Sequence, residues 1–322
     1  VLYGANSSGK SNLGFAIMDI STHLFDGVSK LLPYKYFLSL DSAESEATFV
    51  YIFKFDNDII EYTYKKDSNR KLTFEEIKEN GKLSFQYNYV TKKIINELSD
   101  IASLKFENNS SNFSMVKFIY NNSDLSEKSA IKRIVDFAAN MLWFRSVRNF
   151  EFITANVTIE DISDYIISNG LVDQLQSFFG INKLNYDLSV EDNFSKKVIV
   201  AKYKNGMAPL AEVASTGTMS LWLYFYWMHK NNKISFLFID EFDAFYHFDL
   251  AKEILSNIIE NDSFQSILTT HNTYICNNEL LRPDCYFMIQ NNVIKNFPNR
   301  TQKVLRQGHN LEKMMLSGEF DE

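Results

Sequence analysis

The sequence has few cysteines and no long apolar run. Its two cysteines, Cys276 and Cys285, are too few for a four-ligand zinc site and do not suggest a disulfide framework. The most apolar stretch, residues 221–228, is about half as long as the roughly 20 residues that a membrane-spanning helix needs. We therefore expect a soluble protein of a reducing cytoplasm, with no membrane partner.

An excess of basic residues is also missing. The 33 lysines and arginines stand against 40 acidic residues, so the net charge is -7 and offers no chain-wide attraction to nucleic acid. Any contact with DNA or RNA would depend on a local patch. The length of 322 residues, with 45% hydrophobic content, exceeds one average domain and predicts a main body that carries insertions.

A glycine-rich loop lies near the beginning of the sequence. Residues 4–11, GANSSGKS, match the phosphate-binding pattern G-x-x-x-x-G-K-[ST] at every position. Apolar residues then recur at helical spacing from Leu13 to Leu24, so the loop leads into a helix. Only three residues precede the loop, whereas a strand usually has about five or six. We expect the natural chain to begin further upstream and to recognise adenine there.

The residue types in this loop suit a nucleoside triphosphate. Its glycines permit a tight backbone path, and its amides and the helix N-terminus present donors to phosphate oxygens. Lys10 would reach the β and γ phosphates, and the hydroxyl of Ser11 would bind Mg2+. The residues expected to contact ATP are Gly4, Asn6, Ser7, Ser8, Gly9, Lys10, Ser11 and Asn12.

A strand of the buried type ends in two acids much later in the chain. Residues 234–239 are followed by Asp240 and Glu241. Taken alone, this pattern fits a core strand that ends at an acidic turn equally well. Together with the phosphate loop it predicts that Asp240 holds Mg2+, through water, and that Glu241 acts as the general base on the attacking water.

A third motif follows the next predicted strand, residues 266–269. There Thr270 and His271 lie just past the strand end. Ligands collect at the carboxyl ends of parallel strands, so Lys10, Glu241 and His271 are expected to converge on one γ-phosphate as the catalytic residues. A lone histidine is more often structural, but this placement favours a catalytic role.

The fourth motif is the turn Ser215, Thr216, Gly217 and Thr218, before an apolar helix over 219–228. Serine and threonine before a helix are typical N-caps. A capped helix end is also an anion site, so a structural and a functional role are compatible here.

The sequence between these motifs changes character twice. Alternating runs from 47 to 87 predict an antiparallel β-meander, and the signals from 91 to 179 are mostly helical. Strand signals return at 196–203, and strands and helices then alternate, which predicts a parallel sheet. Residues expected on one face of a helix in the insertion are Ile131, Ile134, Val135, Ala138, Met141 and Leu142.

The insertion also contains a group of basic and aromatic residues. Such a cluster can hold nucleic acid, although charges of this kind more often form a solvated helix face. Its members are Lys132, Arg133, Arg145 and Arg148, with Trp143 and Phe144 among them.

The four motifs in this order resemble the ABC-type ATPases of the SMC, RecF and overcoming-lysogenization-defect group, and most of all the compact prokaryotic ATPases of phage defence and abortive infection. The tails RQGHNLE at 306–312 and LSGEFD at 316–321 resemble the close of the compact members. The resemblance implies an α/β fold with a P-loop core of mixed or parallel sheet, an antiparallel β subdomain and a helical insertion. The expected division is an N-terminal core half over 1–90, a mainly helical insertion over 91–190 and a C-terminal core half over 191–322.

The resemblance also implies a Mg2+-dependent ATPase that works as a head-to-tail dimer or higher oligomer. The turn from Ser215 to Thr218 of one subunit would contact the γ-phosphate bound by the other. Asp243 falls where such proteins communicate across that interface, although a solvated turn acid is an equally good interpretation.

The implied role is that of an ATP-hydrolysing sensor or regulatory subunit of an abortive-infection type antiviral defence system. It would control a separate effector, for which a nuclease is a candidate. The alternative is a DNA-repair or chromosome-maintenance ATPase that binds DNA through its insertion. A transporter subunit fits poorly, because Thr216 stands where transporter-type members carry glycine. A scaffold without turnover would not need Glu241.

Overall fold

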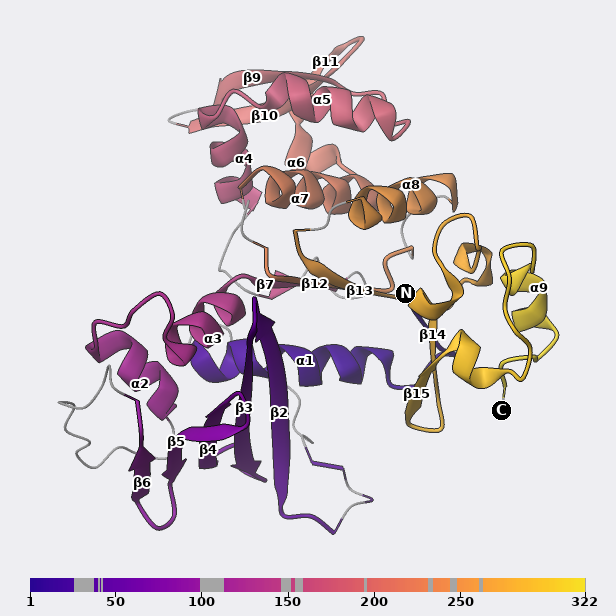
Figure 1. The fold of residues 1–322 in the computed structure, drawn as a ribbon. Coiled ribbons are helices and arrows are strands. Elements are labelled where there is room, and N and C mark those ends of the chain that lie inside the picture. Colours follow the sequence, from indigo (N-terminus) through magenta and orange to yellow (C-terminus); the bar gives the residue numbers. More distant parts are fainter. Residues whose placement is uncertain are drawn as a thin grey trace. The chain divides into compact units, whose positions relative to one another are not determined.

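The computed structural model describes residues 1–25, 38–39, 41, 43–98, 113–145, 152–153, 159–193, 196–230, 234–243, 248–260 and 263–321 (Figure 1). The chain forms two compact units. The first combines Val1–Gly14 with Leu142–Glu322, and the second is Phe15–Met141. The three-part division by residue range therefore stays a prediction, and the first unit draws on both ends of the chain.

A mixed seven-stranded sheet forms the centre of the first unit. Its order is β15-β14-β1-β13-β12-β7-β8. The strands β14, β1, β13 and β12 are parallel to one another, and the outer pairs β14–β15 and β7–β8 are antiparallel. Their bounds are β1 Leu2–Tyr3, β7 Met141–Arg145, β8 Phe152–Ile153, β12 Phe236–Asp240, β13 Gln265–Thr270, β14 Phe287–Gln290 and β15 Val293–Asn296. This is the mixed, largely parallel α/β core that the motifs predicted.

Helices and a small sheet complete this unit. Figure 1 shows α7 and α8 side by side over one face of the large sheet, with α5 beyond α7. Every residue from Leu221 to Trp227 on α7 is buried, because this helix is apolar on all sides and packs between the sheet and the helices α4 and α5. The bounds are α4 Ile159–Ser168, α5 Val172–Ile181, β9 Asp187–Asn193, β10 Lys196–Tyr203, β11 Gly206–Pro209, α6 Leu210–Val213, α7 Thr216–Lys230 and α8 Phe248–Ile259.

The C-terminal segment packs on the edge of the large sheet around a core of its own. Phe297 stacks on Phe320 with ring centroids 4.3 Å apart, and on Tyr286 at 5.6 Å. The buried guanidinium of Arg300 donates to carbonyl oxygens of Met288 and Phe320, which ties the tail to β14. The short elements here are η3 Thr273–Ile275, η4 Pro283–Cys285, η5 Phe297–Arg300 and α9 Leu311–Leu316.

The second unit contains the predicted meander. Five antiparallel strands follow one another in sequence order, β2 Glu46–Phe55, β3 Asp58–Asp67, β4 Leu72–Glu79, β5 Lys82–Asn88 and β6 Lys93–Asn96. Asp56 (φ 53°), Asn80 (φ 50°) and Gly81 (φ 80°) take the left-handed conformations that its tight turns need. The first four strands confirm the prediction, and β6 adds a fifth in a range expected to be helical. The helices are α2 Met115–Asn122, α3 Ala130–Ala139 and the second half of α1 Lys10–Leu24.

One helical prediction was wrong at its end. Met141 and Leu142 were expected to share a helix face with Ile131 and its neighbours, but α3 ends at Ala139 and β7 begins at Met141. Asn140 ends the helix, because its side-chain amide donates to the Asp136 carbonyl at 2.7 Å. Met141 and Leu142 are buried in a strand, and a short apolar run fits either structure until its neighbours are known.

A buried carboxylate organises the second unit. Glu75, on β4, is 0% exposed and its carboxylate accepts hydrogen bonds from the side chains of Tyr62, Tyr89 and Ser114 at 2.5–2.6 Å, and from the backbone N–H of Met115 at 2.6 Å. The Nε2 atom of His23, on α1, lies 3.0 Å from Glu75 Oε1.

In the described part of the chain, no helix combines the length and apolar character that crossing a membrane requires.

Candidate functional site

The predicted phosphate loop connects β1 to α1 at the carboxyl edge of the large sheet. The backbone N–H of Gly4 donates to the Thr270 carbonyl at 3.3 Å, and that of Ser8 donates to the Ala5 carbonyl at 3.2 Å. Ser7 (φ 63°) and Gly9 (φ 102°) are left-handed, which turns the backbone back toward the helix. The loop thus has the compact path expected of a phosphate cradle.

Gly4 has no room for a side chain. A Cβ there would lie 2.4 Å from Ser8 Oγ and 2.5 Å from Ile289 Cγ2. Ile289, on β14, therefore supports the loop from a neighbouring strand. Sequence reasoning missed this residue, because a single isoleucine in an apolar run carries no sign of what it contacts.

Lys10, the first residue of α1, is only 5% exposed. Its ammonium donates to the carbonyl oxygens of Gly4 at 2.7 Å and Ala5 at 3.0 Å, so it lies folded over the loop. Burial lowers the pKa of Lys10, more than the nearby carboxylates of Glu241 and Asp240 raise it. The loop therefore holds a positive charge whose hydrogen bonds, among the described residues, go to two neutral carbonyls.

Ser11 and Asp240 come together, as predicted for a shared metal site. Ser11 Oγ donates to Asp240 Oδ2 at 2.7 Å across 229 positions of sequence. The other oxygen of the Asp240 carboxylate, Oδ1, accepts from the hydroxyl of Thr269 at 2.7 Å. Asp240 is 2% exposed. Both its oxygens are thus held by hydroxyl groups in a buried position.

Glu241 and His271 lie at the same edge of the sheet. Glu241 follows β12 directly, is half-buried and has a left-handed backbone, with φ 49°. His271 is exposed and follows Thr270, whose carbonyl bonds Gly4 of the phosphate loop. Asn272 N–H donates to Thr270 Oγ1 at 2.9 Å and shapes the turn after β13. The loop, the acids and the histidine therefore belong to adjoining turns, as the parallel-strand argument predicted.

The Ser215 turn has the geometry of a helix cap. Ser215 Oγ accepts from the Thr218 N–H at 3.2 Å and lies 2.9 Å from Thr218 Oγ1, at the start of α7. Ser215 is exposed, and the side chain of Thr216 lies outside the described residues. The structural role of the turn is thus observed, and its action on a second subunit stays a prediction. The predicted interface residue Asp243 has a buried Oδ1 without a hydrogen-bond partner in the described part of the chain.

The residues present fit a nucleotide with Mg2+. Ser8 Oγ, inside the loop, is buried and has no partner among the described residues, so a hydrogen-bonding group is available to a ligand there. Among the same residues no group of three or more His, Cys, Asp or Glu side chains could hold a metal. A donor set of one hydroxyl and one carboxylate suits Mg2+, which keeps several waters and takes phosphate oxygens as its other ligands.

In the basic and aromatic group predicted as a candidate nucleic-acid patch, the tryptophan ring does not face solvent. Trp143 is fully buried and packs edge-on against Phe238, with centroids 5.8 Å apart. Lys132 pairs with Asp136 at 3.2 Å, and Arg133 with Asp58 at 2.9 Å. A buried tryptophan cannot stack on bases. The Arg145 side chain and Arg148 lie outside the described residues.

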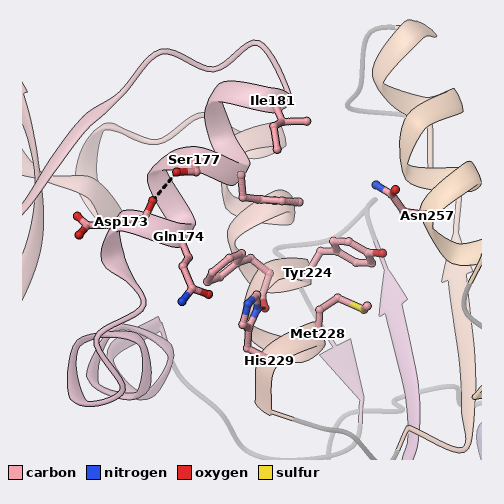
Figure 2. A pocket seen from close by; sticks show the side chains of 10 residues that line it. Asp173, Gln174, Ser177, Ile181, Tyr224, Met228, His229 and Asn257 are labelled. Carbon is pink, nitrogen blue, oxygen red and sulfur yellow. Dashed lines mark hydrogen bonds between the residues drawn. The ribbon is translucent and has the colours of Figure 1, made fainter.

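A groove of about 620 Å³ lies away from the loop, between α5 and α7 (Figure 2). Phe178, Tyr224, Phe225 and Met228 are among its apolar lining, and Gln174 and Asn257 are among its polar lining. The hydroxyl of Tyr224 is buried without a partner in the described part of the chain, and burial raises its pKa to about 12. Part of the groove lining comes from α7, the helix that begins at the Ser215 turn. No motif in the sequence predicted this groove.

No curated protein matches the chain. Among solved structures, the SMC head domain from Thermotoga maritima is similar at 16% identity with a TM-score of 0.41, and the match covers 91% of this chain and 87% of that chain.

A sequence profile matches residues 1–277, a range that includes the phosphate loop, the Ser215 turn, both acids and His271. The profile describes an "AAA domain, putative AbiEii toxin, Type IV TA system". The protein is thus a P-loop ATPase by fold, and the chain belongs to this AAA-domain family.

Proposed function

We propose that the protein binds ATP with Mg2+ at the loop of residues 4–11 and hydrolyses it. The observation that carries this proposal is the 2.7 Å hydrogen bond between Ser11 and Asp240, because it joins the phosphate loop to the acidic strand end. Two motifs far apart in sequence meet where phosphoryl transfer requires both. The family assignment supports the same conclusion.

Each residue has a defined task in this proposal. The loop amides and Ser8 bind phosphate oxygens, and Lys10 exchanges the carbonyls of Gly4 and Ala5 for phosphate oxygens, which are stronger, charged acceptors. Ser11 and Asp240 would hold Mg2+, which when bound offsets the negative charge of the phosphates. Glu241 accepts the proton of the attacking water, and His271 contacts the γ-phosphate from the turn after β13.

The active form in this proposal is a homodimer or higher homo-oligomer. Ser215, Gly217 and Thr218 at the start of α7, with Thr216, would complete the site of a second subunit. The start of α7 supports this, because the N-terminus of a helix favours an anion and Ser215 is exposed there. The Asp243 carboxylate, whose Oδ1 has no hydrogen-bond partner among the described residues, is a further candidate contact across the interface.

The biological role that we propose is regulatory. An ATP-driven change in assembly would control a separate effector protein, with a nuclease as one candidate, in a cytoplasmic abortive-infection type defence system. The family's description as a putative toxin of a type IV toxin–antitoxin system supports this context. The alternative, a DNA-repair or chromosome-maintenance ATPase, has less support from its candidate patch, since one of the two aromatic residues there, Trp143, is buried.

The test is Mg2+-dependent ATP hydrolysis by the purified full-length protein, with Glu241→Gln and Lys10→Ala beside the wild type. Turnover in the wild type and its loss in both variants is the expected result. A protein that neither binds nor hydrolyses ATP would remove the proposal altogether. Salt-dependent DNA affinity in the same preparation would favour the alternative role, because phosphate contacts weaken as salt rises.

A further inference from the structure

We propose that Thr269 is a positioning residue that holds both acids of the site, Asp240 and Glu241, in place for the proposed ATP hydrolysis, on which this inference rests. Its hydroxyl donates to Asp240 Oδ1 at 2.7 Å and accepts from the backbone N–H of Glu241 at 2.8 Å. One side chain therefore contacts the metal-binding acid and the backbone of the general base together.

The need for such a residue follows from how β12 ends. The parallel ladder pairs Ile239 with Leu268, so Asp240 and Thr269 are the next residues on the two strands. Glu241 then turns into the left-handed conformation, and its N–H leaves the regular ladder. The Thr269 hydroxyl takes that N–H, and the Thr269 carbonyl accepts the Phe242 N–H at 3.2 Å. Three consecutive residues of the acidic strand end are thus fastened to one residue of β13.

The consequence for the site is a fixed orientation of the Asp240 carboxylate. Thr269 takes Oδ1, which leaves Oδ2 to Ser11 of the phosphate loop at 2.7 Å. Thr269 is 0% exposed, so water cannot replace its hydroxyl. Removing the hydroxyl would let the carboxylate rotate and would loosen the turn that aims Glu241, while the phosphate loop itself stays intact.

Substitutions at Thr269 separate the hydroxyl from the shape of the side chain. Thr269→Val keeps the shape and removes the donor and acceptor, Thr269→Ser keeps the hydroxyl, and Thr269→Cys supplies a weaker hydrogen-bonding group of similar size. Thr73→Val is the matched control, because the Thr73 hydroxyl is buried without a partner in the described part of the chain.

We expect Thr269→Val to lower kcat by about 10- to 100-fold, the size of effect that a small misplacement of catalytic groups produces. Thr269→Ser should restore most of the rate, with Thr269→Cys between them, and Thr73→Val should match the wild type. If Thr269→Val fails to fold, the comparison of kcat between Thr269→Ser and Thr269→Cys tests the inference, and Thr269→Ser should be the faster. Affinity for ATP without a divalent ion should stay within about twofold, because the loop contacts are unchanged.

A second readout is independent of turnover. Electron paramagnetic resonance can measure Mn2+ binding to the ADP-bound protein. Binding should weaken by about tenfold in Thr269→Val and recover in Thr269→Ser, because the hydrogen bond from the residue 269 hydroxyl orients the Asp240 carboxylate as a metal ligand. Wild-type kcat and Mn2+ affinity in Thr269→Val, or equal losses in the Val and Ser variants, would overturn the inference. A wild type without ATP binding or turnover would instead overturn the proposed function.

Discussion

Ser11 and Asp240 are 229 residues apart in sequence, yet Ser11 Oγ lies 2.7 Å from Asp240 Oδ2. This contact joins the two chain segments of the first unit, Val1–Gly14 and Leu142–Glu322. It also brings the phosphate loop and the acidic strand end into one place.

Replacing Lys10 should abolish ATP binding. Its buried ammonium already lies on the loop carbonyls of Gly4 and Ala5 and is the cation available to the β and γ phosphates. Fluorescence anisotropy of a labelled ATP analogue measures the loss in Lys10→Ala. Lys204→Ala, at an exposed turn of the same unit, is the control and should bind normally. Normal affinity in Lys10→Ala would undermine the whole site.

Glu241→Gln should slow hydrolysis by about 10² to 10⁴ while leaving ATP binding intact, because the amide keeps the shape but cannot accept a proton. A coupled phosphate-release assay measures the rate, and the labelled analogue measures binding. Turnover at the wild-type rate in this variant would assign the base to another residue.

ATP should drive the Glu241→Gln protein into dimers or higher oligomers, because slow hydrolysis leaves the nucleotide bound between subunits. Mass photometry with and without ATP and Mg2+ measures the change in mass. Ser215→Arg should block it, since a long charged side chain at the exposed start of α7 would meet the partner's site. If ATP binds with no change in mass and Ser215→Arg has no effect, the turn is a helix cap only.

Gly14→Ala should destabilise the first unit. A Cβ at Gly14 would lie 2.8 Å from Trp143 Cζ2 and 2.9 Å from Phe238 Cε1, and both rings are fully buried. Overpacking of this kind costs about 1–3 kcal/mol of unfolding free energy, which urea denaturation measures. Gly180→Ala is the matched control: it also lies in a helix, but its Cβ would meet nothing within 4 Å, so stability should hold or rise. Equal effects of the two substitutions would argue against the close approach.

The stability of the second unit should fall as pH falls. Burial lowers the pKa of His23 below its ordinary 6.5, more than the hydrogen bond to Glu75 raises it. The unfolded chain therefore takes up a proton below pH 6.5 that the folded chain does not, so the loss begins there and continues down to the folded pKa of His23. Urea denaturation of the wild type between pH 8 and pH 5 measures this slope, and His23→Gln should flatten it. An unchanged slope in His23→Gln would assign the effect to other groups.

Glu75 should add a second loss in more acid solution. Burial alone would raise its pKa, but hydrogen bonds from His23, Ser114 and Tyr62 outweigh burial and hold the pKa below its ordinary 4.5. Its contribution is present above pH 4.5 and is lost as pH falls through the folded pKa. At pH 7, Glu75→Gln should cost about 1–3 kcal/mol of unfolding free energy, because the amide nitrogen of glutamine cannot accept a hydrogen bond and leaves a buried donor around position 75 without its acceptor. A cost near that of a change at an exposed glutamate, such as Glu97→Gln, would contradict this.

The sequence alone was sufficient for those features that depend on neighbouring residues. The phosphate loop is one continuous segment from Gly4 to Ser11, so its pattern can be recognised in the sequence without knowledge of the fold. The strands of the meander alternate and their turns are marked, so the range predicted for the meander, 47–87, agrees within one residue at each end with the range from β2 to β5. Asp240, Glu241 and His271 were predicted to lie at one edge of the sheet because the ends of parallel strands face one edge; their roles stay predictions.

Only the tertiary structure decided which distant side chains meet. Thr269 looked like any residue of a buried strand until its hydroxyl was seen on Asp240, and Ile289 had no signal of its place beneath Gly4. Met141 and Leu142 extended a helical pattern, yet they are buried in β7 beside the neighbouring strands. The physical reason is common to all three: local periodicity records which face of an element is apolar, whereas hydrogen bonding and packing between elements depend on contacts between separate segments of the chain, 29 positions apart for Thr269 and Asp240.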